Sequence, residues 1–238
     1  MVILNKIAKS FGKNEVLKDT SLNLNKSGIY SILGPNGSGK TTMIKILLGM
    51  VNPDKGDILF KGERVNGLDK YRKDISYLPQ IASFPENLTV DELFTFIEKL
   101  RGEPDFKQEL IDLFEVEEYR NKTLRNLSGG TRQKVNLISC LMYNTELIIL
   151  DEPSVGLDPI SLLKLKDLVL AEKEKGKIIL ITTHIMKLVD DLSDQIIFLL
   201  DGKIHFSGTK EEMLKNTESN DMEHAMASIL TNKKAKNV

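Results

Sequence analysis

Apolar positions along the chain recur with two different periods. In the first 32 residues, short apolar segments alternate with turn residues, which predicts antiparallel strands that lead into a buried strand at 29–33. A glycine-rich loop follows at 34–39, and TTMIKILLGM after it has the spacing of a helix that ends near Gly49. Further strand patterns lie at 56–65, 75–80, 147–151, 177–183 and 195–208.

Between residues 81 and 145 the apolar residues recur at helical spacing, without a convincing strand pattern. We interpret 81–145 as a helical subdomain inserted into a core formed by 1–80 and 146–210. A helix is expected near 160–175, and the segment 211–238 is expected to form a C-terminal helix in EEMLKN and a polar, frayed tail. The fold class predicted is α/β, with a mainly parallel core sheet covered on both faces and an N-terminal antiparallel β part.

Length and composition fit a single domain that spans 1–238. Apolar residues make up 41% of the chain and charged residues 28%, an ordinary globular balance. The net charge of −1 creates no field that would draw the molecule to nucleic acid, so no nucleic-acid partner is expected. The single cysteine, Cys140, excludes an internal disulfide, and its apolar surroundings in VNLISCLM indicate a buried structural thiol.

The chain shows no sign of a membrane span or a signal peptide. Its longest apolar runs, such as IIFLL at 196–200, fall far short of the roughly 18–20 residues that cross a bilayer. The N-terminal segment has a lysine within its apolar residues and lacks a small-residue cleavage site. If the protein works at a membrane, a partner must supply the span.

The string GPNGSGKT at 34–41 matches the GxxxxGK[ST] pattern of a phosphate-binding loop. Its glycines allow positive backbone dihedrals, so that several N–H groups and the start of a helix can face an anion. Lys40 can then reach the β- and γ-phosphates, and the Thr41 hydroxyl can ligate Mg²⁺. A plain glycine-rich turn is the alternative, but a chance match is on the order of one in a hundred. The residues expected to bind the nucleotide are Gly34, Pro35, Asn36, Gly37, Ser38, Gly39, Lys40, Thr41 and Thr42.

A second string, LIILDEP at 147–153, has the character of a buried strand that ends in two carboxylates. Asp151 can hold Mg²⁺ directly or through water, and Glu152 can orient or deprotonate the attacking water. Such a pair is common at strand ends and would mean little alone. Together with a phosphate-binding loop, it predicts nucleotide hydrolysis.

The third string is LSGGTRQ at 127–133, and with it the chain resembles the nucleotide-binding subunit of ATP-binding cassette (ABC) transporters over about residues 2–210. The resemblance implies ATP with Mg²⁺ and a head-to-tail dimer with a second copy of the chain. In that dimer, Ser128, Gly129 and Gly130 contact the γ-phosphate bound to the opposite copy. The simpler reading is that Ser128 only caps a helix. Thr131 stands where the common signature has Gln.

Smaller motifs extend the resemblance. It implies that Phe11 stacks on adenine, that Val16 lines the same base, and that Asp158 in SVGLD belongs to a loop that crosses the dimer. His205 and His224 match no motif and are expected at the surface. The catalytic residues implied are Glu152, His184, which contacts the γ-phosphate, and Gln80, and the Mg²⁺ ligands implied are Thr41, Gln80 and Asp151.

The function that this resemblance implies is the ATPase subunit of a multi-subunit transporter. It would lie on the cytoplasmic face of the cell membrane, bound to separate permease subunits that 84–93 contacts. The YLPQ form and the compact helical region are similar to export-type or accessory systems. QIASFPENLTVDEL and LSGGTRQKVNL are similar to the ATPase of the copper-related transporter that serves nitrous oxide reductase maturation. The alternative is a soluble ABC ATPase of an assembly system, such as iron–sulfur cluster biogenesis.

Overall fold

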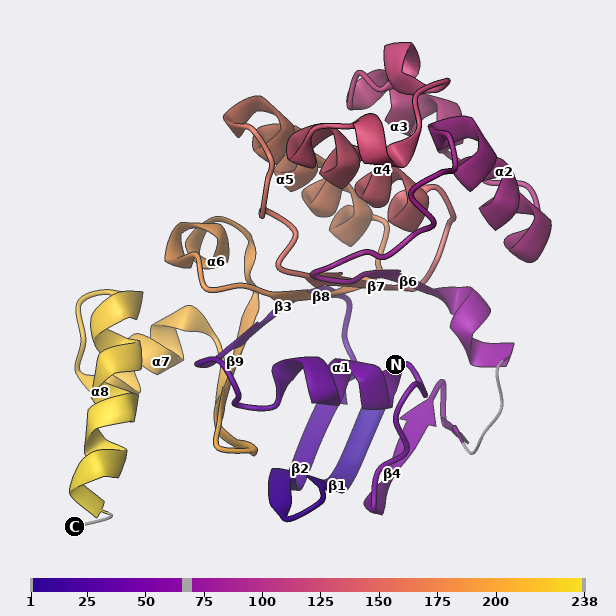
Figure 1. The fold of residues 1–238 in the computed structure, drawn as a ribbon. Coiled ribbons are helices and arrows are strands. Elements are labelled where there is room, and N and C mark those ends of the chain that lie inside the picture. The colour runs from indigo at the N-terminus through magenta and orange to yellow at the C-terminus, as the bar shows by residue number, and fades with distance from the viewer. Residues whose placement is uncertain (1, 66–69, 237–238) are drawn as a thin grey trace. The chain divides into compact units, whose positions relative to one another are not determined.

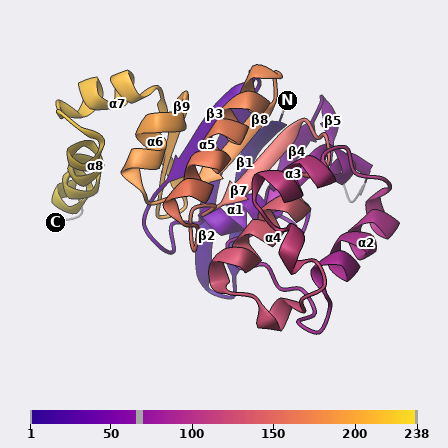
Figure 2. The same ribbon diagram turned by 90° about the horizontal axis from the view of Figure 1, so that it is seen from above.

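The chain forms two compact units in the computed structural model, which describes residues 2–65 and 70–236. The first unit takes in the described residues of Met1–Asp69 and Leu180–Val238, and the second is Lys70–Ile179. Figures 1 and 2 show the helices and strands of both units. The strand β8 (Ile178–Thr182) contains the point in the chain where the division falls.

The first unit begins with an antiparallel sheet, as the alternating apolar segments predicted. Its strands lie in the order β2-β1-β4-β5. Apolar side chains on β1 and β2 point into the core at alternating positions, among them Leu4, Leu22 and Leu24. The strands are β1 (Val2–Phe11), β2 (Asn14–Leu24), β4 (Lys55–Phe60) and β5 (Glu63–Arg64).

A second sheet in the first unit carries the phosphate loop. β3 (Gly28–Leu33), buried along its whole length, pairs in parallel with β9 (Gln195–Leu200), and β9 pairs antiparallel with β10 (Lys203–Gly208). The chain leaves β3 through the loop 34–39 and enters α1 (Lys40–Leu47). The helix ends close to Gly49, as predicted.

Three further helices belong to this unit: α6 (Met186–Leu192), which precedes β9, and α7 (Lys210–Thr217) and α8 (Met222–Lys236), which follow β10. In Figure 1, α7 lies next to β9, and α8 lies beside α7. The predicted polar tail is therefore wrong, because α8 occupies most of it. Its apolar side chains join a cluster on β9 that includes Phe198 and Met213. The α8 members of the cluster are Met222, Ala225, Met226, Ile229 and Leu230.

The second unit combines a pair of parallel strands with four helices. β6 (Ile75–Leu78) pairs in parallel with β7 (Leu147–Asp151), and α4 packs against β6 while α2 and α3 pack against α4. The helices are α2 (Val90–Arg101), α3 (Lys107–Leu113), α4 (Gly129–Leu141) and α5 (Pro159–Glu174). Short 3₁₀ turns lie at η1 (Lys70–Asp74), η2 (Glu117–Tyr119) and η3 (Leu124–Asn126).

The helical character of 81–145 is confirmed, since β-pairing there is limited to one bridge between Thr89 and Thr123. The predicted subdomain limits stay a prediction; the compact unit that contains this segment runs from Lys70 to Ile179. Cys140 is buried on α4, as expected. Within the described residues, no helix has the length and apolar character needed to cross a membrane.

Candidate nucleotide site

The phosphate loop 34–39 has the backbone conformation that its glycines predict. Gly34, Gly37 and Gly39 have φ angles of 150°, 79° and 108°, which side chains other than hydrogen disfavour. Gly39 occupies the N-cap of α1, where it offers no side chain to the helix, and the first turn of α1 contains no acidic residue. The first N–H groups of α1 and the positive end of its dipole can therefore serve an anion.

At two of these positions the neighbouring atoms leave no room for a Cβ atom, so only glycine fits without a shift of the structure. A Cβ atom on Gly34 would lie 2.0 Å from the carbonyl oxygen of Leu199, and one on Gly39 would lie 2.8 Å from Leu17 Cδ2 and 3.0 Å from the Val16 oxygen. By contrast, a Cβ on Gly37 would meet no described atom within 4 Å. The close approach to β9 and β2 thus fixes the loop in place, and Val16 is part of that support.

The polar groups of the loop suit a phosphate. Lys40 Nζ donates to the carbonyl oxygens of Gly34 and Pro35, at 2.7 and 3.1 Å, so its charge lies over the loop. Ser38 Oγ is buried and has no hydrogen-bond partner within the described part of the chain. A phosphate oxygen would accept from both groups and would replace neutral carbonyls by a charge-assisted bond to Lys40. Thr41 and Thr42 lie in the first turn of α1.

The other candidates of the first unit lie near strand ends. Phe11 is the last residue of β1 and is 52% exposed, with Lys9 Nζ 5.5 Å from its ring centre. Val16 lies on β2, which pairs with β1, so both residues predicted to contact the base belong to one sheet. His184 is exposed and follows β8 by two residues. His205 and His224 are exposed, as expected.

In the second unit, strand register brings two predicted Mg²⁺ ligands to one sheet edge. Leu78 at the end of β6 is paired in parallel with Leu150 of β7, so Gln80 and Asp151 both lie at the carboxyl edge of this pair. Asp151 is 3% exposed. Burial and, to a smaller extent, the nearby charge of Asp151 raise the pKa of Tyr77 on β6 to about 12. At this edge Asp151 is therefore buried, whereas Gln80 is exposed.

Glu152, the predicted general base, has an unusual backbone conformation. It is buried and has a φ of 53°, in the left-handed region that costs a non-glycine residue about 1–2 kcal/mol. Strain of this kind collects at functional sites because the surrounding structure must impose it. The strained turn redirects the chain straight after β7, between Asp151 and Pro153.

The signature string forms the start of α4. Ser128 is the N-cap, and its Oγ accepts the N–H of Thr131 at 3.1 Å, so the simpler reading of Ser128 as a helix cap holds. Its Oγ also lies 2.9 Å from Thr131 Oγ1. Gly129 has space around it, since a Cβ there would meet no described atom within 4 Å. Capping does not exclude an anion here, because Ser128 and Gly129 are both exposed.

The loop that follows Glu152 is packed against this same helix. Gln133 Nε2 donates to the Pro153 oxygen at 3.3 Å, and a Cβ on Gly130 would lie 3.0 Å from the Gly156 oxygen. The side chain of Asp158 caps α5, accepting the N–H and the hydroxyl of Ser161, each at 2.8 Å. The role of Asp158 across a dimer stays a prediction, and its role in capping α5 was missed.

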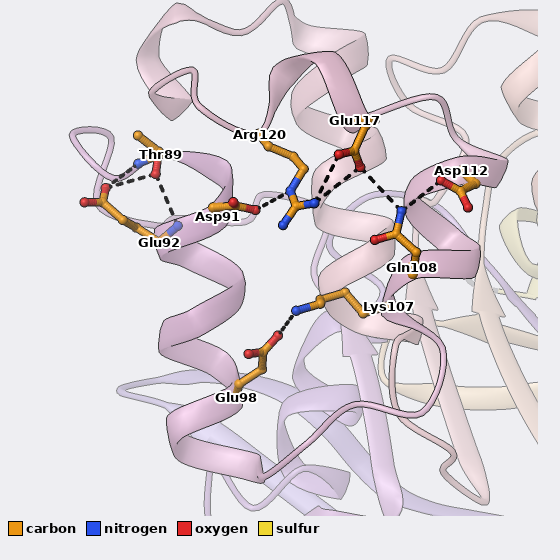
Figure 3. A network of polar contacts seen from close by, with 9 residues as sticks. All are labelled: Thr89, Asp91, Glu92, Glu98, Lys107, Gln108, Asp112, Glu117 and Arg120. Atoms are coloured by element: carbon orange, nitrogen blue, oxygen red, sulfur yellow. Dashed lines mark hydrogen bonds and ion pairs between the residues drawn. The ribbon is translucent and has the colours of Figure 1, made fainter.

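A further set of bonds connects the segment 84–93 with the residues that lead into the signature. Leu124 N donates to the Leu88 oxygen at 2.9 Å and Arg125 N to the Glu86 oxygen at 3.1 Å. Figure 3 shows the side chains beside them, where Arg120 Nε lies 2.6 Å from Asp91 Oδ1 at the start of α2. Sequence reasoning missed this connection, which depends on contacts across about 35 residues of chain.

The ligands predicted for Mg²⁺ suit that ion. Thr41, Gln80 and Asp151 would offer one hydroxyl, one amide oxygen and one carboxylate. Mg²⁺ bound to a nucleotide needs only one or two protein oxygens beside phosphates and water. Across residues 2–65 and 70–236, no group of three or more His, Cys, Asp or Glu residues could form a metal cage.

The phosphate loop, the carboxylates that follow a buried strand and the signature helix together define an ATP-hydrolysing cassette. The sequence pattern of the family described as ABC transporter matches residues 17–155. The lipopolysaccharide export system ATP-binding protein LptB of Haemophilus influenzae is 34% identical over 221 residues, covering 89% of this chain and 92% of that protein. The uncharacterised ABC transporter ATP-binding protein YxlF of Bacillus subtilis is 31% identical over 225 residues, covering 92% and 75%.

Solved structures agree with this relationship. The ATP-binding subunit of an ABC transporter superposes with a TM-score of 0.89 at 25% identity, covering 97% of this chain and 99% of that one. The cassette MJ0796, in a dimeric post-hydrolysis state bound to ADP and Pi, gives a TM-score of 0.76 at 28% identity, covering 88% and 98%. The chain belongs to the ABC transporter family. It has the P-loop ABC ATPase fold and is an ATP-binding subunit that hydrolyses ATP.

Proposed function

We propose that this chain powers an export-type transporter as a head-to-tail dimer of two copies, bound to membrane-spanning permease subunits at the cytoplasmic face. The observation that carries the proposal is the N-terminus of α4. An exposed serine hydroxyl and two glycines begin a 13-residue helix whose first turn contains no acidic residue. Such a helix start attracts an anion, and the nucleotide phosphates of a second copy would supply one.

In the proposed site, the base of ATP stacks on Phe11 beside Val16. The phosphates lie in the loop of Gly34, Pro35, Asn36, Gly37, Ser38, Gly39, Lys40, Thr41 and Thr42. Lys40 leaves the loop carbonyls and binds the β- and γ-phosphates, because a charge-assisted bond to phosphate is stronger than a bond to a neutral carbonyl. The glycine contacts with β2 and β9 support this assignment, since they hold the loop in the required form before ATP arrives.

Hydrolysis in this proposal is a direct attack of water on the γ-phosphate. Glu152 orients the water and accepts its proton, while Gln80 and His184 position the water and the γ-phosphate. Thr41, Gln80 and Asp151 would hold Mg²⁺, which when bound neutralises phosphate charge. Lys40 and the N–H groups of the signature stabilise the negative charge of the transferring group. The strained backbone at Glu152 supports its role.

Closure of the dimer places Ser128, Gly129 and Gly130 of one copy on the γ-phosphate held by the other, with Asp158 in the adjoining loop. The dimeric cassette structures support this arrangement. The permease would contact 84–93. The bonds of this segment to Leu124 and Arg125, just before Ser128, give a route by which closure moves the permease.

Two relatives named as lipopolysaccharide export proteins, from Haemophilus influenzae and Escherichia coli, support export over the soluble assembly role. The narrower prediction of a copper-related system depends only on the strings QIASFPENLTVDEL and LSGGTRQKVNL. It stays a prediction, as does the choice of substrate.

The test is purification of the tagged chain from native membranes in mild detergent. The proposal expects a multi-span membrane protein to purify with it, and expects ATP to drive two copies of Glu152→Gln together. A soluble scaffold as the sole bound protein would favour the assembly role. The identity of the co-purified membrane protein would also decide between a copper-related and another export system.

A further inference from the structure

The third residue of α4 differs from its counterparts in two other helices of this chain. α2 and α7 each begin with a threonine N-cap and carry glutamate at the third helical position. In α2, Glu92 Oε2 accepts the Thr89 N–H at 2.8 Å and lies 3.1 Å from the Thr89 hydroxyl, as Figure 3 shows. In α7, Glu212 Oε2 likewise accepts the N–H of the N-cap residue Thr209. Such a box occupies the cap's N–H group and places a carboxylate at the start of the helix.

In α4 the same position is Thr131, and the geometry changes. Its side chain is too short to return to the Ser128 N–H group. Instead its Oγ1 lies 2.9 Å from Ser128 Oγ, while its N–H donates to that oxygen at 3.1 Å. The start of α4 therefore keeps its cap without a carboxylate.

The number of hydrogen-bonding positions on a hydroxyl leaves two arrangements for the Ser128–Thr131 pair. A serine oxygen can accept two hydrogen bonds and donate one. The Thr131 N–H fills one acceptor position of Ser128 Oγ. When the Thr131 hydroxyl fills the second, the only position left on Ser128 is its proton, which must point away from the helix. In the opposite arrangement, Ser128 would turn a lone pair outward, and an anion would repel it.

We propose that Thr131 is a positioning residue of the signature, whose hydroxyl donates to Ser128 Oγ and so directs the Ser128 proton to the γ-phosphate on the second copy. This inference depends on the proposed function, in which Ser128 meets that phosphate. The next side chain along, Arg132, is directed to Glu86 and to the Leu124 oxygen, at 3.1 and 2.8 Å.

The experiment measures ATP-driven dimerisation in a Glu152→Gln background, where slow hydrolysis lets the dimer accumulate. Thr131→Val removes the hydroxyl and keeps the shape and the branched Cβ. We expect it to raise the ATP concentration for half-maximal dimer, measured by sedimentation, about tenfold, as for loss of an oriented hydrogen bond to a charged acceptor. Thr131→Ser restores the hydroxyl and should stay within about twofold of the parent.

A double-mutant cycle separates this role from a general effect on the helix. Because Thr131 acts through Ser128, Thr131→Val should add nothing once Ser128→Ala is present. Thr131→Ala must reproduce the shift of Thr131→Val. The thermal midpoint of each nucleotide-free Thr131 variant must match that of the protein with the same residue at 128, because Ser128→Ala by itself removes the cap of α4. A full additional loss in the Ser128→Ala background, or an unchanged Thr131→Val, would overturn the proposal while dimerisation of the parent stands. Failure of the parent itself to dimerise with ATP would overturn both the proposed function and this inference.

Discussion

Lys134 of the signature helix forms an ion pair with Asp158 at the start of α5, with 3.2 Å between Nζ and Oδ2. The same carboxylate accepts two hydrogen bonds from Ser161. The backbone bond from Ser161, then the Ser161 hydroxyl, and then Lys134 hold the pKa of Asp158 well below its ordinary value. α4 and the loop 153–158 are therefore joined at both ends of that loop, by Gln133 at Pro153 and by Lys134 at Asp158.

This arrangement predicts that Asp158→Asn lowers the stability of the nucleotide-free protein in a pH-dependent way. The folded pKa is depressed, so the carboxylate's contribution is present above the ordinary aspartate pKa, about 3.9, and is lost as pH falls below it. Asparagine still caps the helix but carries no charge. The difference in thermal midpoint between wild type and Asp158→Asn should be largest near neutral pH and should shrink below about pH 4. Thermal melts across this range measure it, with Asp167→Asn, on an exposed part of α5, as the control for loss of one carboxylate.

A difference that stays constant with pH would show that the charge of Asp158 adds nothing to the cap. Lys134→Gln should remove part of the same pH-dependent difference, because it deletes one of the three donors.

Features that depend on residues close together in the sequence could be predicted from the sequence alone. The motif residues and the succession of strands and helices along the chain were accessible because each depends on neighbours in the chain, as in the β3–loop–α1 segment. The cap at Asp158 was missed although its signal is local, since Asp followed by Pro159 is a common helix start. The ion pair with Lys134 could not be read from the sequence, because it joins residues 24 positions apart.

α8 was missed although its signal is present. Met222, Ala225 and Met226 begin a run of apolar residues at helical spacing, but polar residues at 216–221 and the lysine-rich end conceal it. The apolar cluster around Phe198 of β9 stabilises α8. Its members are far apart in the sequence, so no local pattern predicts it. The Ser128–Thr131 hydroxyl pair likewise follows from side-chain geometry and could not be read from LSGGTRQ.

Packing of α8 gives a prediction on stability. Met222 is 2% exposed in the cluster with Phe198 and Met213, so Met222→Ala should destabilise the first unit by about 2–5 kcal/mol. Met50→Ala makes the same chemical change at a side chain that is 60% exposed, and should cost no more than about 0.5 kcal/mol. Urea unfolding of the two variants measures both values. Equal losses would mean that α8 does not pack as described.

Two glycines of the phosphate loop should differ in how much stability the protein loses when each is replaced by alanine. Gly34→Ala would bring a Cβ to 2.0 Å from the Leu199 oxygen, so the loop or β9 must shift. Gly37→Ala meets no described atom and incurs only the strain of its positive φ, about 1–2 kcal/mol. We expect Gly34→Ala to destabilise the protein by more than Gly37→Ala, as measured by urea unfolding without nucleotide. The reverse order would contradict the close approach of the loop to β9.

The assignment of Glu152 predicts separate effects on binding and on turnover. Glu152→Gln keeps the size of the side chain and removes the base, so steady-state ATPase activity should fall by about 100-fold or more. ATP binding should persist, and the dimer should accumulate because it is not opened by hydrolysis. Glu174→Gln, at the exposed end of α5, is the matched control and should keep wild-type turnover. Wild-type rates in Glu152→Gln would refute the assignment.

The thiol of Cys140 is 6% exposed on α4 and should be protected from labelling in the native protein. Burial raises its pKa to about 12, so the reactive thiolate is scarce in the native protein near pH 8. Because the chain has one cysteine, labelling with a chromogenic disulfide reports on this residue alone. We expect native protein to label slowly, at a rate set by opening of α4, and protein in concentrated urea to label at once. Stoichiometric labelling of native protein within the mixing time would show that α4 opens readily, and would contradict a structural role for this thiol.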